Sequence, residues 1–120
     1  MANEIIASAS LGSSKNGANI SANATKTADM AGDQMIGTVQ IIGTAAEAIS
    51  LGDVSTIGYI FLKNMDATNF VQIALDSGVS TAIFAKLLAG DITLVKAATA
   101  TLYAKADTAN VNLLVAATEL

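Results

Sequence analysis

The sequence predicts an all-β protein, an antiparallel β-sandwich or jelly-roll-like single domain with an N-terminal β-arm. Apolar and polar residues alternate at period two along much of the chain, which is typical of strands with one buried face. Asp, Asn and Gly, which suit turns, interrupt this alternation at short intervals. The length of 120 residues fits one domain with one hydrophobic core. Short strands between regular turns indicate a sandwich or a jelly roll.

Residues 1–33 are predicted to form a hairpin. Asn16-Gly17 is a strong hairpin-turn dipeptide, and strands at about 4–11 and 18–27 can flank it. Most side chains here are small, so the hairpin buries little area by itself. It is therefore either two strands of the same sandwich or an arm that docks on a neighbouring subunit. If it docks, the candidate contact residues are its larger apolar side chains: Ile5, Ile6, Leu11 and Ile20.

Residues 34–120 are predicted to form the β-sandwich. Alternation predicts strands at 35–42, 57–63, 70–75, 92–96, 101–106 and 111–118. Residues 44–50 fit a short helix or an edge strand. Residues 80–89 could form an amphipathic helix, but turn residues interrupt the chain too often for long helices, so we favour a strand.

The composition argues against an enzyme. The chain has no Cys, His, Trp or Pro, and all six basic residues are Lys. Serine triads, Cys–His pairs and zinc hydrolases are therefore excluded, and no cofactor is expected. Asp29 and Asp33 would need several further oxygen ligands to bind calcium, so a solvated loop is favoured and no metal site is predicted. Ten acidic residues offer many carboxylate pairs, so pairing alone does not indicate a glycosidase.

Charge and hydropathy point to an assembly protein. The net charge of −4 and the pI near 4.4 argue against nucleic acid as a partner. The chain is 52% hydrophobic and only 13% charged, with a mean hydropathy of +0.55. It contains no apolar run of about 20 residues, so a membrane span is not expected. We interpret the apolar excess as surface that neighbouring subunits cover. The aromatic residues are expected in the core or an interface: Tyr59, Phe61, Phe70, Phe84 and Tyr103.

The chain from about residue 51 to residue 110 contains a recurring strand-and-turn pattern. Its motifs are Leu51-Gly-Asp53, Lys63-Asn-Met-Asp66, Phe70-Val71, Asp76-Ser-Gly78 and Tyr103-Ala-Lys-Ala106. This pattern resembles small structural proteins encoded among the head and tail genes of tailed bacteriophages. The resemblance implies a β-sandwich virion protein attached to a capsid or a tail. Residues 79–90 depart from the pattern, because many members are enriched in Pro or Gly there, whereas this chain has Val79-Ser-Thr-Ala82 and no Pro.

Three functions fit these observations. The favoured one is a capsid decoration or cement protein that binds the outer shell as an oligomer, with a trimer preferred. Its partners would be the major capsid protein or other virion proteins, and it would be found in the virion after assembly in the host cytoplasm. The second is a tail, neck or fibre-base component. The third is a carbohydrate-binding module, which the absence of Trp disfavours.

Overall fold

The computed structural model describes residues 4–97 and 101–119, which form ten strands and no helix. A hairpin comprises β1 (Ile5–Lys15) and β2 (Ala18–Ala28). The other strands are β3 (Met35–Ile42), β4 (Glu47–Ala48), β5 (Ile57–Asn64), β6 (Val71–Ala74), β7 (Ile83–Leu87), β8 (Ile92–Lys96), β9 (Tyr103–Ala106) and β10 (Val111–Glu119). The expectation of an all-β fold is confirmed.

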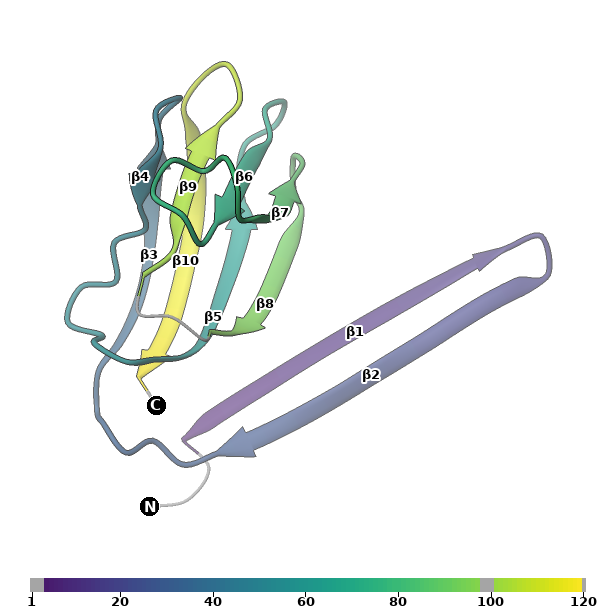
Figure 1. The fold of residues 1–120 in the computed structure, drawn as a ribbon. Helices are drawn as coiled ribbons and strands as arrows, with labels where there is room; N and C mark the ends of the chain where they lie inside the picture. The colour runs from purple at the N-terminus through teal and green to yellow at the C-terminus, as the bar shows by residue number, and fades with distance from the viewer. Residues whose placement is uncertain (1–3, 98–100, 120) are drawn as a thin grey trace.

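Strands β3 to β10 form a sandwich of two antiparallel four-stranded sheets (Figure 1). The strand order is β3-β10-β5-β8 in one sheet and β4-β9-β6-β7 in the other. The chain passes from one sheet to the other at every connection from β3 to β10 except the one between β6 and β7. This winding of eight strands is that of a jelly roll. The predicted fold class is confirmed at this level as well.

The core between the sheets consists of aliphatic side chains. Alternate residues of the central strands β10 and β5 point inward, as the period-two pattern predicted, and are almost wholly buried: Val111, Leu113, Val115, Ala117, Ile60 and Leu62. Tyr59 and Phe61 alternate with Ile60 and Leu62, so they must point to the outer face. All five aromatic side chains are exposed or half-buried, so none is in the core, and the alternative that they pack in an interface stays a prediction.

The two ambiguous segments both contain strands. β4 is a two-residue edge strand within 44–50, and β7 lies within 80–89, so the helical alternatives are wrong. Alternation alone also misplaces the end of β6. Ala74 is buried at the end of β6 and Leu75, just beyond it, is 53% exposed, which is the reverse of the simple pattern.

Asn64 is a buried polar residue that ties β5 to β7. Its Nδ2 donates hydrogen bonds to the carbonyl oxygens of Asn69 at 2.8 Å and Leu87 at 2.9 Å. Its Oδ1 accepts a bond from the backbone N–H of Asp66 at 2.8 Å. Because every side-chain polar atom of Asn64 has a partner, its burial is tolerated and fixes the turn after β5.

Asp76 organises the connection between β6 and β7. Its carboxylate accepts hydrogen bonds from the backbone N–H of Ala82 at 2.9 Å and of Ser80 at 3.0 Å. These N–H groups stabilise the charged form and lower the pKa of Asp76 from 3.8 to about 2. The same connection holds Val79 at a φ of 49°, a left-handed conformation that is unusual for a β-branched residue.

The N-terminal hairpin, which we call the arm, belongs to neither sheet of the sandwich and projects from it (Figure 1). Asn16 and Gly17 have positive φ values of 54° and 83°, as a two-residue turn that follows the strand twist requires. Both strands are longer than predicted, because the pairing continues to this turn. The projection gives the chain a radius of gyration of 15.3 Å, against about 13.6 Å for a compact domain of this length.

Candidate interaction surface

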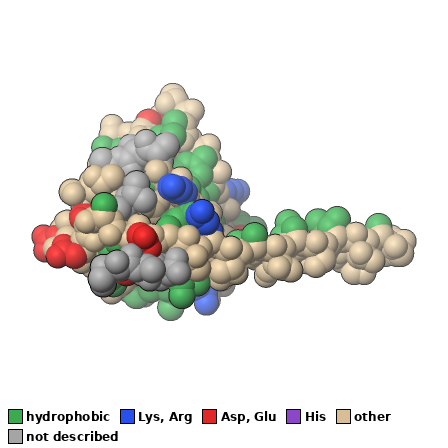
Figure 2. All heavy atoms as spheres, turned by 90° about the horizontal axis from the view of Figure 1, so that it is seen from below, with side chains coloured by type: hydrophobic (Ala, Val, Ile, Leu, Met, Phe, Trp, Pro, Cys, Tyr) green, Lys and Arg blue, Asp and Glu red, His purple; other side chains and the backbone are tan. Residues whose placement is uncertain are grey.

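The arm has one apolar face and one polar face. The antiparallel register places alternate residues of β1 and β2 side by side. One side of the ribbon, which we call the arm face, carries Ala7, Ala9, Leu11, Ser13, Ala18, Ile20, Ala22 and Ala24. The opposite side carries mainly Ser, Thr and Asn. Figure 2 shows hydrophobic side chains gathered along one side of the projecting ribbon. The arm is therefore amphipathic at period two.

No part of residues 4–97 and 101–119 covers the projecting part of the arm. Every residue from Ser8 to Thr27 is exposed, with Leu11 at 64% and Ile20 at 58%. The accessible surface of the chain is 6985 Å², against about 6,000 Å² for a compact monomer of this mass. The chain thus exposes roughly 1,000 Å² more surface than its size requires.

The structure brings three of the four predicted contact residues together. Ile5, Leu11 and Ile20 lie on the same side of the ribbon, whereas Ile6 lies on the opposite side and is 70% exposed. Ile5 is only 3% exposed, because it lies at the base of the arm. Leu11 and Ile20 therefore remain available for contact with another molecule, and their role as contact residues stays a prediction.

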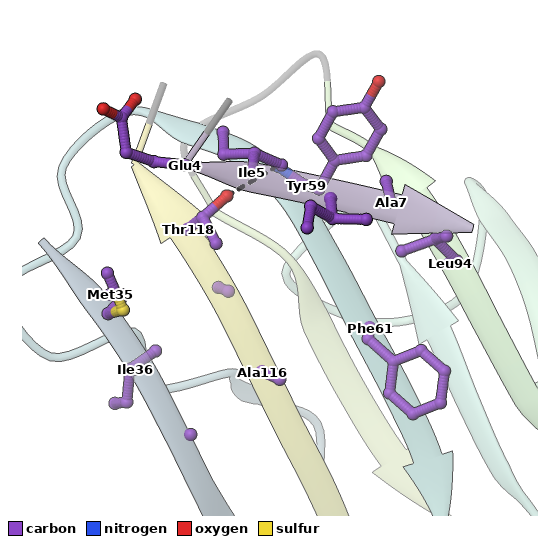
Figure 3. A pocket seen from close by; sticks show the side chains of 13 residues that line it. Glu4, Ile5, Ala7, Met35, Ile36, Tyr59, Phe61, Leu94, Ala116 and Thr118 are labelled. Carbon is purple, nitrogen blue, oxygen red and sulfur yellow. Dashed lines mark hydrogen bonds between the residues drawn. The ribbon is translucent and has the colours of Figure 1, made fainter. Parts of the chain in front are cut away.

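The base of the arm borders a hollow on the sandwich (Figure 3). The hollow has a volume of about 540 Å³. Glu4 to Ala7 form one side of it, and residues of β3, β5, β8 and β10 form the other, including Gly37, Phe61, Leu94 and Ala116. The Glu4 carboxylate accepts a hydrogen bond from the backbone N–H of Met30 at 3.0 Å, which connects the two ends of the arm.

The side of the β3-β10-β5-β8 sheet that faces away from the core is also apolar, and we call this side the outer face. The registers align Gly37, Ala116, Phe61 and Leu94 in one row across the four strands. Val39, Leu114, Lys63 and Ile92 form the next row. Met35 is 65% exposed and Ile41 62% exposed on the same side of β3. An antiparallel sheet that faces water on one side normally has polar residues there.

Sequence reasoning did not single out this outer face as a contact surface. The signal was present in β3, where Met35, Val39 and Ile41 form one face and Ile36 and Ile42, with Thr38 and Gln40 between them, form the other, so large apolar residues lie on both faces of one strand. A strand of that kind is covered on both sides in a folded assembly. The exposed apolar side of β3 therefore marks a surface that its own chain does not cover.

The other sheet carries a polar row on its outward side, beside the exposed apolar side chains of Ile83 and Phe84 on β7. Lys105, Gln72 and Lys86 form a row across β9, β6 and β7. The Nζ of Lys86 lies 4.3 Å from the centre of the Phe70 ring, a cation–π contact that covers part of this aromatic side chain. The arm adjoins the β3-β10-β5-β8 sheet and not this one.

The acidic residues considered as metal ligands lie away from the hollow. Asp29 and Asp33 are exposed in the connection from β2 to β3. Within residues 4–97 and 101–119, no three His, Cys, Asp or Glu side chains are grouped so that they could hold a metal ion. The same part of the chain has no helix long and apolar enough to cross a membrane. The chemistry offered by the arm and the outer face is apolar contact.

Comparison of the chain with protein-family models, with curated proteins and with solved structures finds no match. The resemblance of residues 51–110 to phage structural proteins therefore stays a prediction. A functional proposal therefore rests on the arm, the outer face and the motifs in residues 51–110.

Proposed function

We propose that this chain is a structural protein of a tailed-phage virion, a decoration protein that binds the outer capsid shell as an oligomer. The observation that carries the proposal is the amphipathic arm, whose apolar face is exposed over its whole projecting length. Such a face is unfavourable in water and is stabilised when another molecule covers it. The resemblance of the motifs in residues 51–110 to phage structural proteins supports a virion as the assembly in which the arm is covered.

The mechanism is the burial of apolar area at many equivalent contacts. Each Å² of apolar surface removed from water contributes about 25 cal/mol before the costs of association are subtracted. A single arm rich in Ala contributes modestly, since its side chains are small. A closed shell repeats the contact over many copies, so modest contacts together stabilise the lattice against expansion and disassembly.

The arm and the outer face are two different contact surfaces, and together they support a role in linking neighbouring proteins. The arm is a narrow ribbon that can reach across a subunit boundary, whereas the outer face is broad and belongs to the rigid sandwich. A decoration protein needs both, one surface to hold a neighbouring subunit and a body that fixes the direction of the arm. The partners are the major capsid protein or other virion proteins, together with further copies of this chain.

Copy number in purified particles tests this function. Particles of the phage that encodes the chain are isolated on a density gradient, and the chain is quantified against the major capsid protein by mass spectrometry. We expect a copy number close to that of the capsid protein. A value in the tens would replace the decoration role with a tail, neck or fibre-base position. Absence from intact particles would overturn the virion assignment.

A further inference from the structure

Two apolar surfaces of this chain lack a cover, and they are complementary in form. One is the arm face and the other is the outer face of the β3-β10-β5-β8 sheet. We propose that the arm face of one copy packs on the outer face of a second copy. The occupant of the outer face is thus this same chain, and the contact is a sheet-on-sheet packing between subunits.

The dimensions of the two surfaces agree. The part of β1 beyond Ala7 has eight residues and spans about 27 Å at about 3.4 Å per residue. Two strands spaced by about 4.8 Å make a ribbon roughly 10 Å wide. The outer face has four strands and is therefore about 19 Å wide. The ribbon fits within the outer face of a neighbour and leaves both edges of that sheet outside the contact.

The projecting side chains of each surface also match depressions in the other. Packed sheets lie about 10 Å apart, so large side chains of one must enter spaces in the other. On the arm face the large side chains are Leu11 and Ile20, which alternate with alanines. On the outer face, Gly37 and Ala116 leave a depression beside Phe61, the hollow of about 540 Å³. The alanines of the arm in turn leave room for the projecting Phe61.

In this structure the arm does not cover the outer face of its own chain. Its base crosses one end of the sheet, where Ile5 and Ala7 border the hollow (Figure 3). From Ser8 onward the ribbon leaves the sandwich, as Figure 1 shows, and every residue is exposed to Thr27. The remaining length of the hollow is open to a segment that arrives from another molecule.

The area is sufficient when the exchange is reciprocal. One arm face of about 27 by 10 Å hides about 270 Å² on each partner. Two arms exchanged between two copies therefore hide about 1,100 Å² in total, which is just above the roughly 1,000 Å² that a specific interface needs. Packing of two arms against each other would hide less, since both faces are rich in alanine. It would also leave Met35, Val39 and Ile41 uncovered.

Lysines restrict the register of this contact. Lys26 and Lys15 lie at the two ends of the arm face, and Lys63 and Lys96 point outward from the outer face. Their aliphatic stems can lie along apolar surface while the ammonium groups reach water. Two lysines cannot face each other directly, so registers that align them are disfavoured.

This inference deepens the proposed function and rests on it only in treating the arm as an assembly device. The two can fail separately. Self-association is measured on the purified chain in solution, whereas the virion role is measured by copy number in particles. A chain that self-associates but is absent from particles would retain this inference and lose the virion role. A monomer that is abundant in particles would do the reverse.

Cross-linking of single-cysteine variants tests the contact, because the natural chain has no Cys. Leu11→Cys is placed on the arm face, and Ala116→Cys in the hollow of a second, size-tagged chain. The two are mixed and treated with a short bismaleimide. The matched control replaces Leu11→Cys with Ser10→Cys, which lies next to it on the polar side of the same strand. We expect at least a tenfold higher yield of the mixed cross-link for Leu11→Cys.

Each other outcome contradicts the inference. Equal yields from positions 10 and 11 would mean that the arm meets the sheet by random collision. A dominant product between two Leu11→Cys chains, without the mixed product, would mean that arms pack on arms. No intermolecular product at all would mean that another protein or nothing covers the arm face.

A second pair of variants tests the same contact without cross-linking. Leu11→Lys with Ile20→Lys places two charges on the arm face, whereas Ser10→Lys with Ser21→Lys places the same two charges on the polar side. Both pairs are exposed, so the fold should survive in each. Sedimentation should show that the first variant is monomeric and that the second associates like the natural chain. Association of the first variant would overturn the inference.

Discussion

The arm and the sandwich are built from the same kind of strand but differ completely in burial. In β10 the inward residues Leu113 and Val115 are wholly buried between two sheets. In β1 the corresponding apolar residues Ala9 and Leu11 are exposed, although the alternation is equally regular. The difference lies in what the connections place opposite each strand. The chain crosses between sheets throughout the sandwich, whereas the arm pairs only within itself.

This comparison separates two meanings of an amphipathic strand. Alternation predicts which face of a strand is buried, but it does not predict which molecule covers that face. In the sandwich the cover is the opposite sheet of the same chain, and the stability is that of folding. In the arm the cover is another molecule under our proposal, and the stability is that of association. Substitutions in the two regions should therefore change different equilibria.

The largest expected effect comes from a matched pair of leucines. Leu62→Ala removes a wholly buried side chain and should lower the free energy of unfolding by about 2–5 kcal/mol. Leu11→Ala should lower it by less than about 0.5 kcal/mol when the chain is monomeric, since this side chain is exposed. Urea unfolding at low protein concentration measures both. A loss of several kcal/mol for Leu11→Ala would mean that the arm folds back on its own sandwich in solution.

A smaller loss is expected from the buried amide of the sandwich. Asn64→Ala leaves the carbonyl oxygens of Asn69 and Leu87 without their donor, which should cost about 2–3 kcal/mol of unfolding free energy. The matched control is Asn112→Ala. Because Asn112 is exposed on β10, this substitution should lower the free energy of unfolding by less than about 0.5 kcal/mol. Equal effects in the two variants would show that the turn after β5 does not depend on this amide.

The smallest effect is a dependence on pH that belongs to the sandwich alone. The folded pKa of Asp76, about 2, is below its ordinary value of 3.8, so the unfolded chain binds the proton more readily. The stabilisation is therefore present above pH 3.8 and is lost as the pH falls through about 2. Thermal unfolding of the natural chain and of Asp76→Asn should differ most near neutral pH and converge in acid. A difference that is constant with pH would contradict the role assigned to this carboxylate.

The sequence was sufficient for most of the fold. Period-two alternation located the strands from 35–42 to 111–118, and Asn16-Gly17 located the hairpin turn, because both signals depend on local backbone geometry. Alternation could not predict the burial of Ala74 and the exposure of Leu75, since β6 ends between them and burial there depends on the three-dimensional arrangement. Residue type alone could not decide between the core and an interface for Tyr59 and Phe61, whereas their alternation with the buried Ile60 and Leu62 points them away from the core.

The sequence predicted only one of the two candidate contact surfaces, the arm, and did not predict the outer face. Leu11 and Ile20 stood out as large apolar residues among small ones, which identified the arm. The outer face consists of residues from β3, β10, β5 and β8, and no local pattern indicates that Gly37, Ala116 and Phe61 form one row. Strand order is a long-range property of the fold, so a surface assembled across four strands requires the structure.

The most direct test of the account is the mass in solution of the full chain and of a chain with a shortened arm. In the shortened chain, an Asn-Gly turn replaces residues 9–24, which keeps Ile5 and the base of the hairpin. Light scattering on a sizing column gives both masses at matched concentrations. We expect the full chain to have at least twice the 12.1 kDa of one chain, and the shortened chain to be a monomer. The same number of chains per particle in both proteins would contradict the claim that the arm covers, and is covered by, a second copy.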